Sequence, residues 1–287
     1  MRPRPIVAGT DFSRGAQLAV SRATGLADDL DLPLQLAHVV DGSTAAPRTP
    51  LPKQWRTSLV GRPIPRGSDM ARFELAGKQL DKVARGRGVQ RIVRRHGKAH
   101  EELIRAARSA NARLLVVGAH RPRKAMERFL LGTTAERVLR GSSQAVLIVR
   151  RPSNRRYRNV LAPIDFSSVT PRQLAVLREV VPDARVTLLH AIPEAGERVL
   201  AVVTAAERRA RRLALDAGFP RNAVNVVVEQ ADPREAILRA ERRLRPNLVV
   251  VGTRGRKGLG RMLLGSVAEH VIRGTSTDVL AVPPHAH

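Results

Sequence analysis

The chain of 287 residues contains no cysteine, and aromatic side chains make up only 2% of it. The absence of cysteine excludes disulfides, cysteine-ligated zinc and thiol catalysis. The N-terminus leads into a strand-like pattern without the apolar stretch of a signal peptide, and no apolar run approaches the roughly 20 residues that a membrane helix needs. From these absences we expect a soluble, cytoplasmic protein.

Acidic residues are scarce beside basic ones, at 25 against 51, which gives a net charge of +26. Only six of the basic residues are lysine. One interpretation of this charge is binding to nucleic acid or another polyanion. The alternative is arginine-favouring codon usage, which spreads guanidinium groups over solvated helix surfaces. We favour the alternative, because the arginines are scattered and the aromatics that stack on bases are lacking.

The most informative positive feature is an internal repeat. Four segments recur in the same order in the two halves of the chain, which indicates a tandem of two similar domains. We place these at 1–152 and 153–287. The paired segments are PIVAGTDFS (5–13) with NVLAPIDFS (159–167), LQLAHVV (34–40) with VTLLHAI (186–192), LLVVG (114–118) with LVVVG (248–252), and LRGSSQAVLIV (139–149) with IRGTSTDVLAV (272–282).

Short apolar runs alternate with helical patterns in each half, which predicts an α/β fold with βαβ units around a parallel sheet. Pro171 and Pro233 suit the first turns of helices, while Ser167, Ser168 and Asp232 suit helix caps. In the second half the expected strands lie near 159–164, 185–191, 224–229, 247–252 and 278–282, and the expected helices at 171–181, 197–215 and 233–244.

The first half carries an insertion-like segment at 41–69 that is rich in proline and glycine. We expect a long loop there, and a loop of this length is either functional or disordered. The chain's single tryptophan, Trp55, lies within it. It would anchor the loop on a partner or on the protein's own core, and we favour the second.

An apolar run at 248–251 leads directly into a glycine loop of the form G-x2-G-x9-G-S, and a helical pattern follows. Glycine lets backbone N–H groups approach an anion, and a helix N-terminus adds its positive dipole end. Ligands of open α/β sheets bind at the carboxyl ends of strands, where the strand order reverses. In a 3-2-1-4-5 order, Asp165 and Gly252 flank that point, so the sequence predicts a phosphate cradle there.

This loop, the aspartate at the end of the first strand and the apolar final strand resemble the universal stress protein family, over nearly the whole chain. The resemblance implies two doubly wound domains, each a five-stranded parallel sheet of order 3-2-1-4-5 with helices on both faces. It also implies ATP as the cofactor, with phosphates on the loop, the aspartate near the adenosine and the backbone after strand two facing adenine. Carried over, the cofactor-binding residues are Pro163, Ile164, Asp165, Ala191, Ile192, Gly252, Arg254, Gly255, Gly265, Ser266 and Val267.

Structural explanations of the same residues remain open: Asp165 also suits a turn or helix-cap carboxylate, and the glycines also suit a flexible, arginine-rich loop. The first half keeps Asp11, Gly118, Gly132 and Thr133, but Arg121 and Pro122 stand where bare backbone should approach the phosphates. We interpret this half as a degenerate copy. The alternative is that Arg121, Arg123 and Lys124 contact phosphates through their side chains.

Evidence for catalysis is slight. There is no P-loop motif, no Ser-His-Asp spacing and no paired carboxylates in a loop. His38 and His190 fit sheet-end positions better than general bases, and the tail residues His285 and His287 are a weak metal signal. Asp165 could hold Mg2+ only with phosphates supplying most ligands.

We therefore expect a nucleotide-binding regulatory protein with ATP held mainly by the second half. The alternatives are a slow ATPase, a nucleic-acid or polyanion-binding stress protein, and a purely structural scaffold. The final strands at 145–149 and 278–282 are apolar, and exposed edges invite pairing. In the family such strands pair between domains, which predicts an internal pseudo-dimer and allows a homodimer. The alternative is that a loop of the same domain covers each strand.

Overall fold

The computed structural model describes residues 3–40, 78, 80–81, 83–84, 88–119, 131–152, 156–192, 199–253 and 264–284. The described residues form two compact units: unit 1 comprises 3–119 and 132–152, and unit 2 comprises Leu131 and 156–284. Among the described residues, no helix is both long and apolar enough to cross a membrane. The expected loop at 41–69, with Trp55, lies outside the described residues.

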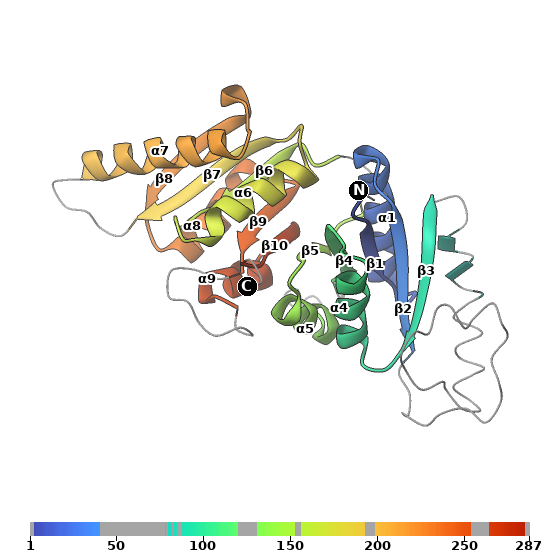
Figure 1. The fold of residues 1–287 in the computed structure, drawn as a ribbon. Helices are drawn as coiled ribbons and strands as arrows, with labels where there is room; N and C mark the ends of the chain where they lie inside the picture. Colours follow the sequence, from blue (N-terminus) through green and yellow to red (C-terminus); the bar gives the residue numbers. More distant parts are fainter. Residues whose placement is uncertain are drawn as a thin grey trace. The chain divides into compact units, whose positions relative to one another are not determined.

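Unit 1 is a five-stranded sheet in which every registered pair of neighbouring strands is parallel, in the order β3-β2-β1-β4-β5 (Figure 1). Its described elements, in chain order, are β1 (Ile6–Gly9), α1 (Arg14–Leu30), β2 (Leu34–Val40), β3 (Val89–His96), α4 (Ala99–Ser109), β4 (Leu114–Gly118), α5 (Thr133–Gly141) and β5 (Ala145–Val149).

Unit 2 repeats this arrangement with the strand order β10-β9-β6-β7-β8, again with parallel pairs. Numbered within the unit, the order is 3-2-1-4-5, as predicted for both halves. Its described elements are β6 (Asn159–Pro163), α6 (Val169–Val180), β7 (Arg185–Ile192), α7 (Val199–Asp216), the short 3-10 helix η3 (Arg221–Ala223), β8 (Val224–Gln230), α8 (Pro233–Leu244), β9 (Leu248–Gly252), α9 (Ser266–Gly274) and β10 (Asp278–Val282).

The helices of unit 2 pack on the sheet in two groups. Helices α6 and α7 contact each other, as do α8 and α9. The strands between them are apolar because both faces are covered: Leu248, Val249 and Val250 of β9 are fully buried. Within each unit the predicted final strand, β5 or β10, lies at one end of that unit's strand order, next to β4 or β9.

The starts of α8 and α6 both lie at predicted cap residues, but only one of the two is capped by a side chain. Asp232 caps α8, because its side chain accepts a hydrogen bond from the Arg234 amide, and Pro233 occupies the first turn. Ser168 occupies the N-cap position of α6, as predicted, but its side chain makes no cap bond, and the Ser167 hydroxyl has no hydrogen-bond partner. The nearby carboxylate of Asp165 takes the Ser167 amide instead.

Candidate functional site

The crevice predicted for unit 2 begins where β6 and β9 stop pairing. Their register holds only for Val160 with Leu248 and Leu161 with Val249. Beyond these pairs, the side-chain amide of Gln173 on α6 donates to the carbonyl of Pro163 at 2.8 Å and to that of Val250 at 2.9 Å. Gln173 is only 2% exposed. This one amide therefore satisfies the carbonyls of two strands at the point where the strands separate.

Asp165 follows β6 at this crevice and is part of a local turn. Its Oδ1 accepts from the Ser167 amide at 2.9 Å and from the Thr170 hydroxyl at 3.4 Å. Asp11 of unit 1 accepts from the Ser13 amide at 3.0 Å in the same way. Asp165 therefore does act as a turn carboxylate, the structural role that the sequence left open. Its bonds to Ser167 and Thr170 both use Oδ1.

The residue after each aspartate adopts a left-handed backbone conformation, with φ of 63° at Phe12 and 58° at Phe166. This turns the Phe166 ring onto His190, with 4.3 Å between ring centroids, as Phe12 does with His38 at 4.6 Å. On the Phe166 ring lies the guanidinium of Arg209 from α7, 4.5 Å from the centroid. The crevice is thus bordered by a cluster of arginine, phenylalanine and histidine in mutual contact.

Both histidines hold the ends of their strands together. The Nδ1 atom of His190 lies 2.8 Å from the Ile164 carbonyl, and that of His38 lies 2.7 Å from the Thr10 carbonyl. Because a carbonyl only accepts, each Nδ1 must carry the proton and donate. This agrees with the expectation that they are sheet-end residues.

The predicted adenine-facing residues lie at the end of β7. The last pair of β7 with β6 is Leu189 with Pro163, so Ala191 and Ile192 extend past the end of β6. The Ile192 carbonyl accepts from the Ala231 amide at 3.2 Å, and its side chain is buried. The carbonyl of Ile164 accepts a hydrogen bond from Nδ1 of His190. The fold therefore already uses the carbonyls of Pro163, Ile164 and Ile192.

The glycine loop leaves β9 at Gly252 and returns at Gly265. The Gly265 amide donates to the Thr253 carbonyl at 2.8 Å, which ties the two ends of the loop together. Helix α9 then begins at Ser266, with Gly265 as its N-cap residue. Ser266 is exposed and Val267 half-buried, and the first amides of a helix have no partner within it. Arg254 and Gly255, also predicted here, lie outside the described residues.

The corresponding place in unit 1 is tightly packed. A Cβ on Gly118 at the end of β4 would lie 2.3 Å from the backbone of Gly15 in α1. A Cβ on Gly15 would lie 2.5 Å from the Ala119 carbonyl oxygen. Gly132 precedes α5 with φ of 86°, a conformation that favours glycine. Each of these glycines has a reason within the fold, so none requires a ligand to explain it.

Several residues singled out by their sequence lie outside the described residues. They are Arg121, Pro122, Arg123 and Lys124 of the first glycine loop and His285 and His287 of the tail. Among the residues that are described, no group of three or more histidines or carboxylates is placed to hold a metal ion.

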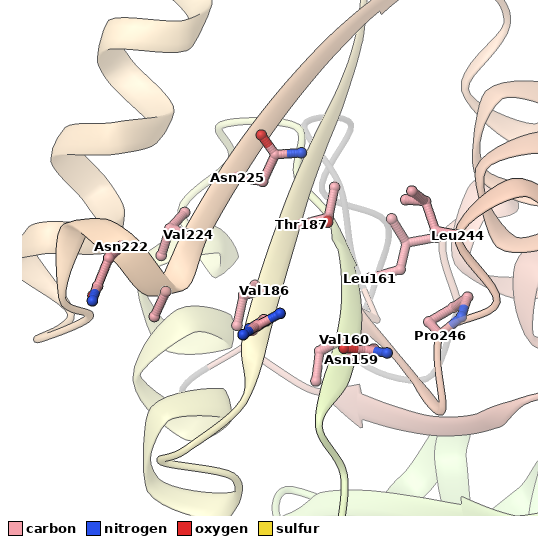
Figure 2. Close-up of a pocket in the computed structure, with 12 residues that line it drawn as sticks. Asn159, Val160, Leu161, Val186, Thr187, Asn222, Val224, Asn225, Leu244 and Pro246 are labelled. Atoms are coloured by element: carbon pink, nitrogen blue, oxygen red, sulfur yellow. The ribbon is translucent and has the colours of Figure 1, made fainter.

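A separate hollow of about 350 Å³ lies at the other end of the unit 2 sheet, and none of the predicted site residues lines it. Figure 2 shows side chains of β6, β7 and β8 around it, with Leu244 and Pro246 beside them. Its lining includes the exposed Asn159, Arg185 and Asn225, which lie toward the amino ends of their strands. The predicted site, by contrast, lies at the carboxyl ends.

Sequence reasoning missed three residues at the crevice: Phe166, Gln173 and Arg209. A signal existed for the first, because both aspartates are followed by phenylalanine and serine in a chain with only five phenylalanines. Gln173 and Arg209 gave no signal, since each comes from a helix whose packing brings it to the strand ends.

Two doubly wound α/β units in tandem, each with an aspartate after its first strand and a glycine before its last helix, define a duplicated α/β protein. The universal stress protein family model matches residues 3–150 and again 156–283. The chain belongs to this family as a tandem member with two such domains, which confirms the resemblance seen in the sequence.

Several relatives match this chain over nearly their whole length. The chain is 28% identical over 314 residues to a universal stress protein of Mycolicibacterium smegmatis, covering 97% of each chain. It is 29% identical over 301 residues to a universal stress protein of Mycobacterium tuberculosis, covering 96% of this chain and 95% of the relative. The crystal structure of a universal stress protein from Archaeoglobus fulgidus matches with a TM-score of 0.73 at 22% identity, covering 99% and 100% of the two chains. At that identity the structural match supports the fold alone.

Proposed function

We propose that this tandem universal stress protein binds an adenine nucleotide, ATP, mainly through unit 2, and that it acts as a regulatory module rather than a metabolic enzyme. The observation that carries the proposal is the geometry at Gly265. It is the N-cap of α9 and closes the glycine loop, yet its φ of −63° is open to any residue. The backbone conformation therefore does not explain this glycine, whereas close approach by a ligand does.

The ligand would lie across the carboxyl ends of β6, β7 and β9. Its phosphates would meet the first amides of α9 and the hydroxyl of Ser266, since a helix N-terminus favours anions. A ribose hydroxyl would donate to Asp165. The adenine would lie past the end of β6, near the backbone of Ala191 and the amide of Ile192. Gly252, Arg254 and Gly255 would complete the phosphate loop.

Mg2+ would be held mainly by the phosphates and by water. Asp165 is the single carboxylate among the residues proposed for this site, and its Oδ1 already accepts two hydrogen bonds. Six oxygen ligands at octahedral geometry cannot come from one such group. The domain boundaries 1–152 and 153–287, and the pairing of the halves through their final strands, stay predictions.

The test is to denature freshly purified protein and identify the released ligand by mass spectrometry. We expect one adenine nucleotide per chain. The Gly265→Val variant should release none, because a branched side chain would stand between the ligand and the backbone. Titration calorimetry with ATP should likewise give one site in the native chain and at least a tenfold weaker one in the variant.

A matched control is Gly25→Val on α1, where a Cβ would meet nothing within 4 Å. This variant should keep its nucleotide. The proposal fails if Gly265→Val retains the native nucleotide content while remaining folded, or if the native chain neither carries nor binds an adenine nucleotide. Two nucleotides per chain would overturn its restriction to unit 2.

A further inference from the structure

Helix α7 packs against the rest of unit 2 through a narrow row of small residues. Its buried residues are Ala206, Ala210 and Ala214, spaced four apart on one side of the helix. The helix contacts β8 and α6 and runs beside β8 (Figure 1). Because the buried row is so narrow, most of the circumference of α7 faces solvent.

The side opposite the alanines carries arginine. Arg208, Arg211 and Arg212 are all exposed, and they surround Leu215, which is 42% exposed. These residues are spaced three and four apart, so they share one face of the helix. We call these four residues the α7 arginine face. Arg209 is not part of it, since its guanidinium lies on the Phe166 ring.

The arginines of this face differ in their surroundings from arginines of α8. No ion pair or hydrogen bond joins the three arginine side chains to any other residue within the part of the chain that the structure describes. Helix α8 differs, because Arg239 and Arg243 hold the carboxylate of Glu229 at 3.6 and 3.0 Å. The arginines of unit 2 are thus not equivalent, although their sequence context looks the same.

We propose that the α7 arginine face binds the phosphate backbone of duplex DNA without reading its sequence. Guanidinium groups pair with phosphate oxygens through two parallel hydrogen bonds, and the net charge of +26 draws polyanions toward the protein. The helix has no aromatic residue that could stack on the bases of a single strand. The face also lacks asparagine and glutamine, the side chains that read adenine. This inference concerns a different surface from the nucleotide site and does not depend on it.

The test compares two triple variants that remove the same charge. Arg208→Gln/Arg211→Gln/Arg212→Gln empties the α7 arginine face, and Arg239→Gln/Arg242→Gln/Arg243→Gln removes three arginines from α8. Glutamine keeps the helix propensity of arginine, so both helices should persist. Binding to a 20-base-pair duplex is measured by fluorescence anisotropy at several salt concentrations.

Each phosphate contact adds about 0.9 to the slope of log affinity against log salt. The α7 variant should therefore have a slope shallower by about 2.7. When the salt is raised from 50 to 200 mM, the factor by which its affinity falls should be about 40 times smaller than the factor for the native chain. The α8 variant should keep the native slope. ATP binding and the melting temperature should stay native in both.

Three results would overturn the proposal. Equal loss of slope in both variants would mean that net charge alone attracts DNA. Absence of duplex binding by the native chain at 50 mM salt would remove the activity itself. Binding to vesicles of anionic lipid or to single-stranded DNA that exceeds duplex binding, and that the α7 variant loses, would assign the face to a different partner.

Discussion

The two units of this protein keep glycines at the same positions of the same motif for different physical reasons. In unit 1, Gly118 is required because the backbone of Gly15 lies where a Cβ would stand, and Gly132 is required by its positive φ. In unit 2, Gly265 has a φ of −63° that suits any residue. Packing and backbone conformation therefore explain the glycines of unit 1, whereas the backbone conformation of Gly265 does not explain the glycine of unit 2, for which we propose the close approach of a ligand.

The units also differ at the start of the first helix. In unit 1, Ser13 caps α1, and Gln17 is exposed, with its amide on the Phe12 carbonyl at 3.2 Å. In unit 2, the Ser167 hydroxyl makes no bond, and Gln173 is buried between two strand ends. These differences give three paired predictions, in which one substitution is made in each unit.

The largest effect is expected for Gln173→Leu. Leucine fills the space but leaves the carbonyls of Pro163 and Val250 buried without a donor, at about 1–3 kcal/mol each. We expect the free energy of unfolding to fall by about 2–6 kcal/mol in urea denaturation. The partner substitution, Gln17→Leu, should stay within about 0.5 kcal/mol of the native chain because the side chain is exposed. Equal losses in the two variants would contradict the special position of Gln173.

The second pair is Gly132→Ala and Gly265→Ala. Alanine at Gly132 would be strained by the positive φ, at a cost of about 1–3 kcal/mol in stability, with ATP binding unchanged. Alanine at Gly265 should leave stability unchanged or raise it by up to about 1 kcal/mol, while weakening ATP binding. Urea denaturation and titration calorimetry on both variants check this. The distinction between the units would be contradicted if Gly132→Ala weakened ATP binding and Gly265→Ala lowered stability.

The smallest effects concern the serines. Ser13→Ala removes the bond from the Ala16 amide to the Ser13 hydroxyl and should cost about 1 kcal/mol. Ser167→Ala removes a buried hydroxyl that makes no bond, so its melting temperature should equal or exceed that of the native chain. A loss at Ser167 as large as at Ser13 would indicate a cap that forms in solution.

Much of the fold could be predicted from the sequence because it depends on local patterns. Four apolar residues before Gly252 predict a buried strand, and Asp232 with Pro233 predicts the start of α8, as found. The repeat of four segments predicts the duplication that the family model confirms. The N-cap position of α6 at Ser168 was predicted correctly, but not the residue that accepts the hydrogen bond, because two serines and an aspartate stand within four residues and only the backbone geometry selects Asp165 as the acceptor.

The sequence by itself determined the two α/β units, because period, repeat and turn residues are encoded along the chain, and it showed the resemblance to the family, which implied the strand order within each unit. Only the tertiary structure decided which side chains meet at the carboxyl ends of the strands. Gln173 reaches two carbonyls 10 and 77 residues away, and Arg209 donates to the carbonyl and covers the ring of Phe166, 43 residues away. It also distinguished the arginines of α7 from those of α8. Such contacts depend on how helices pack across the sheet, and no pattern along the chain specifies which distant residues this packing brings together.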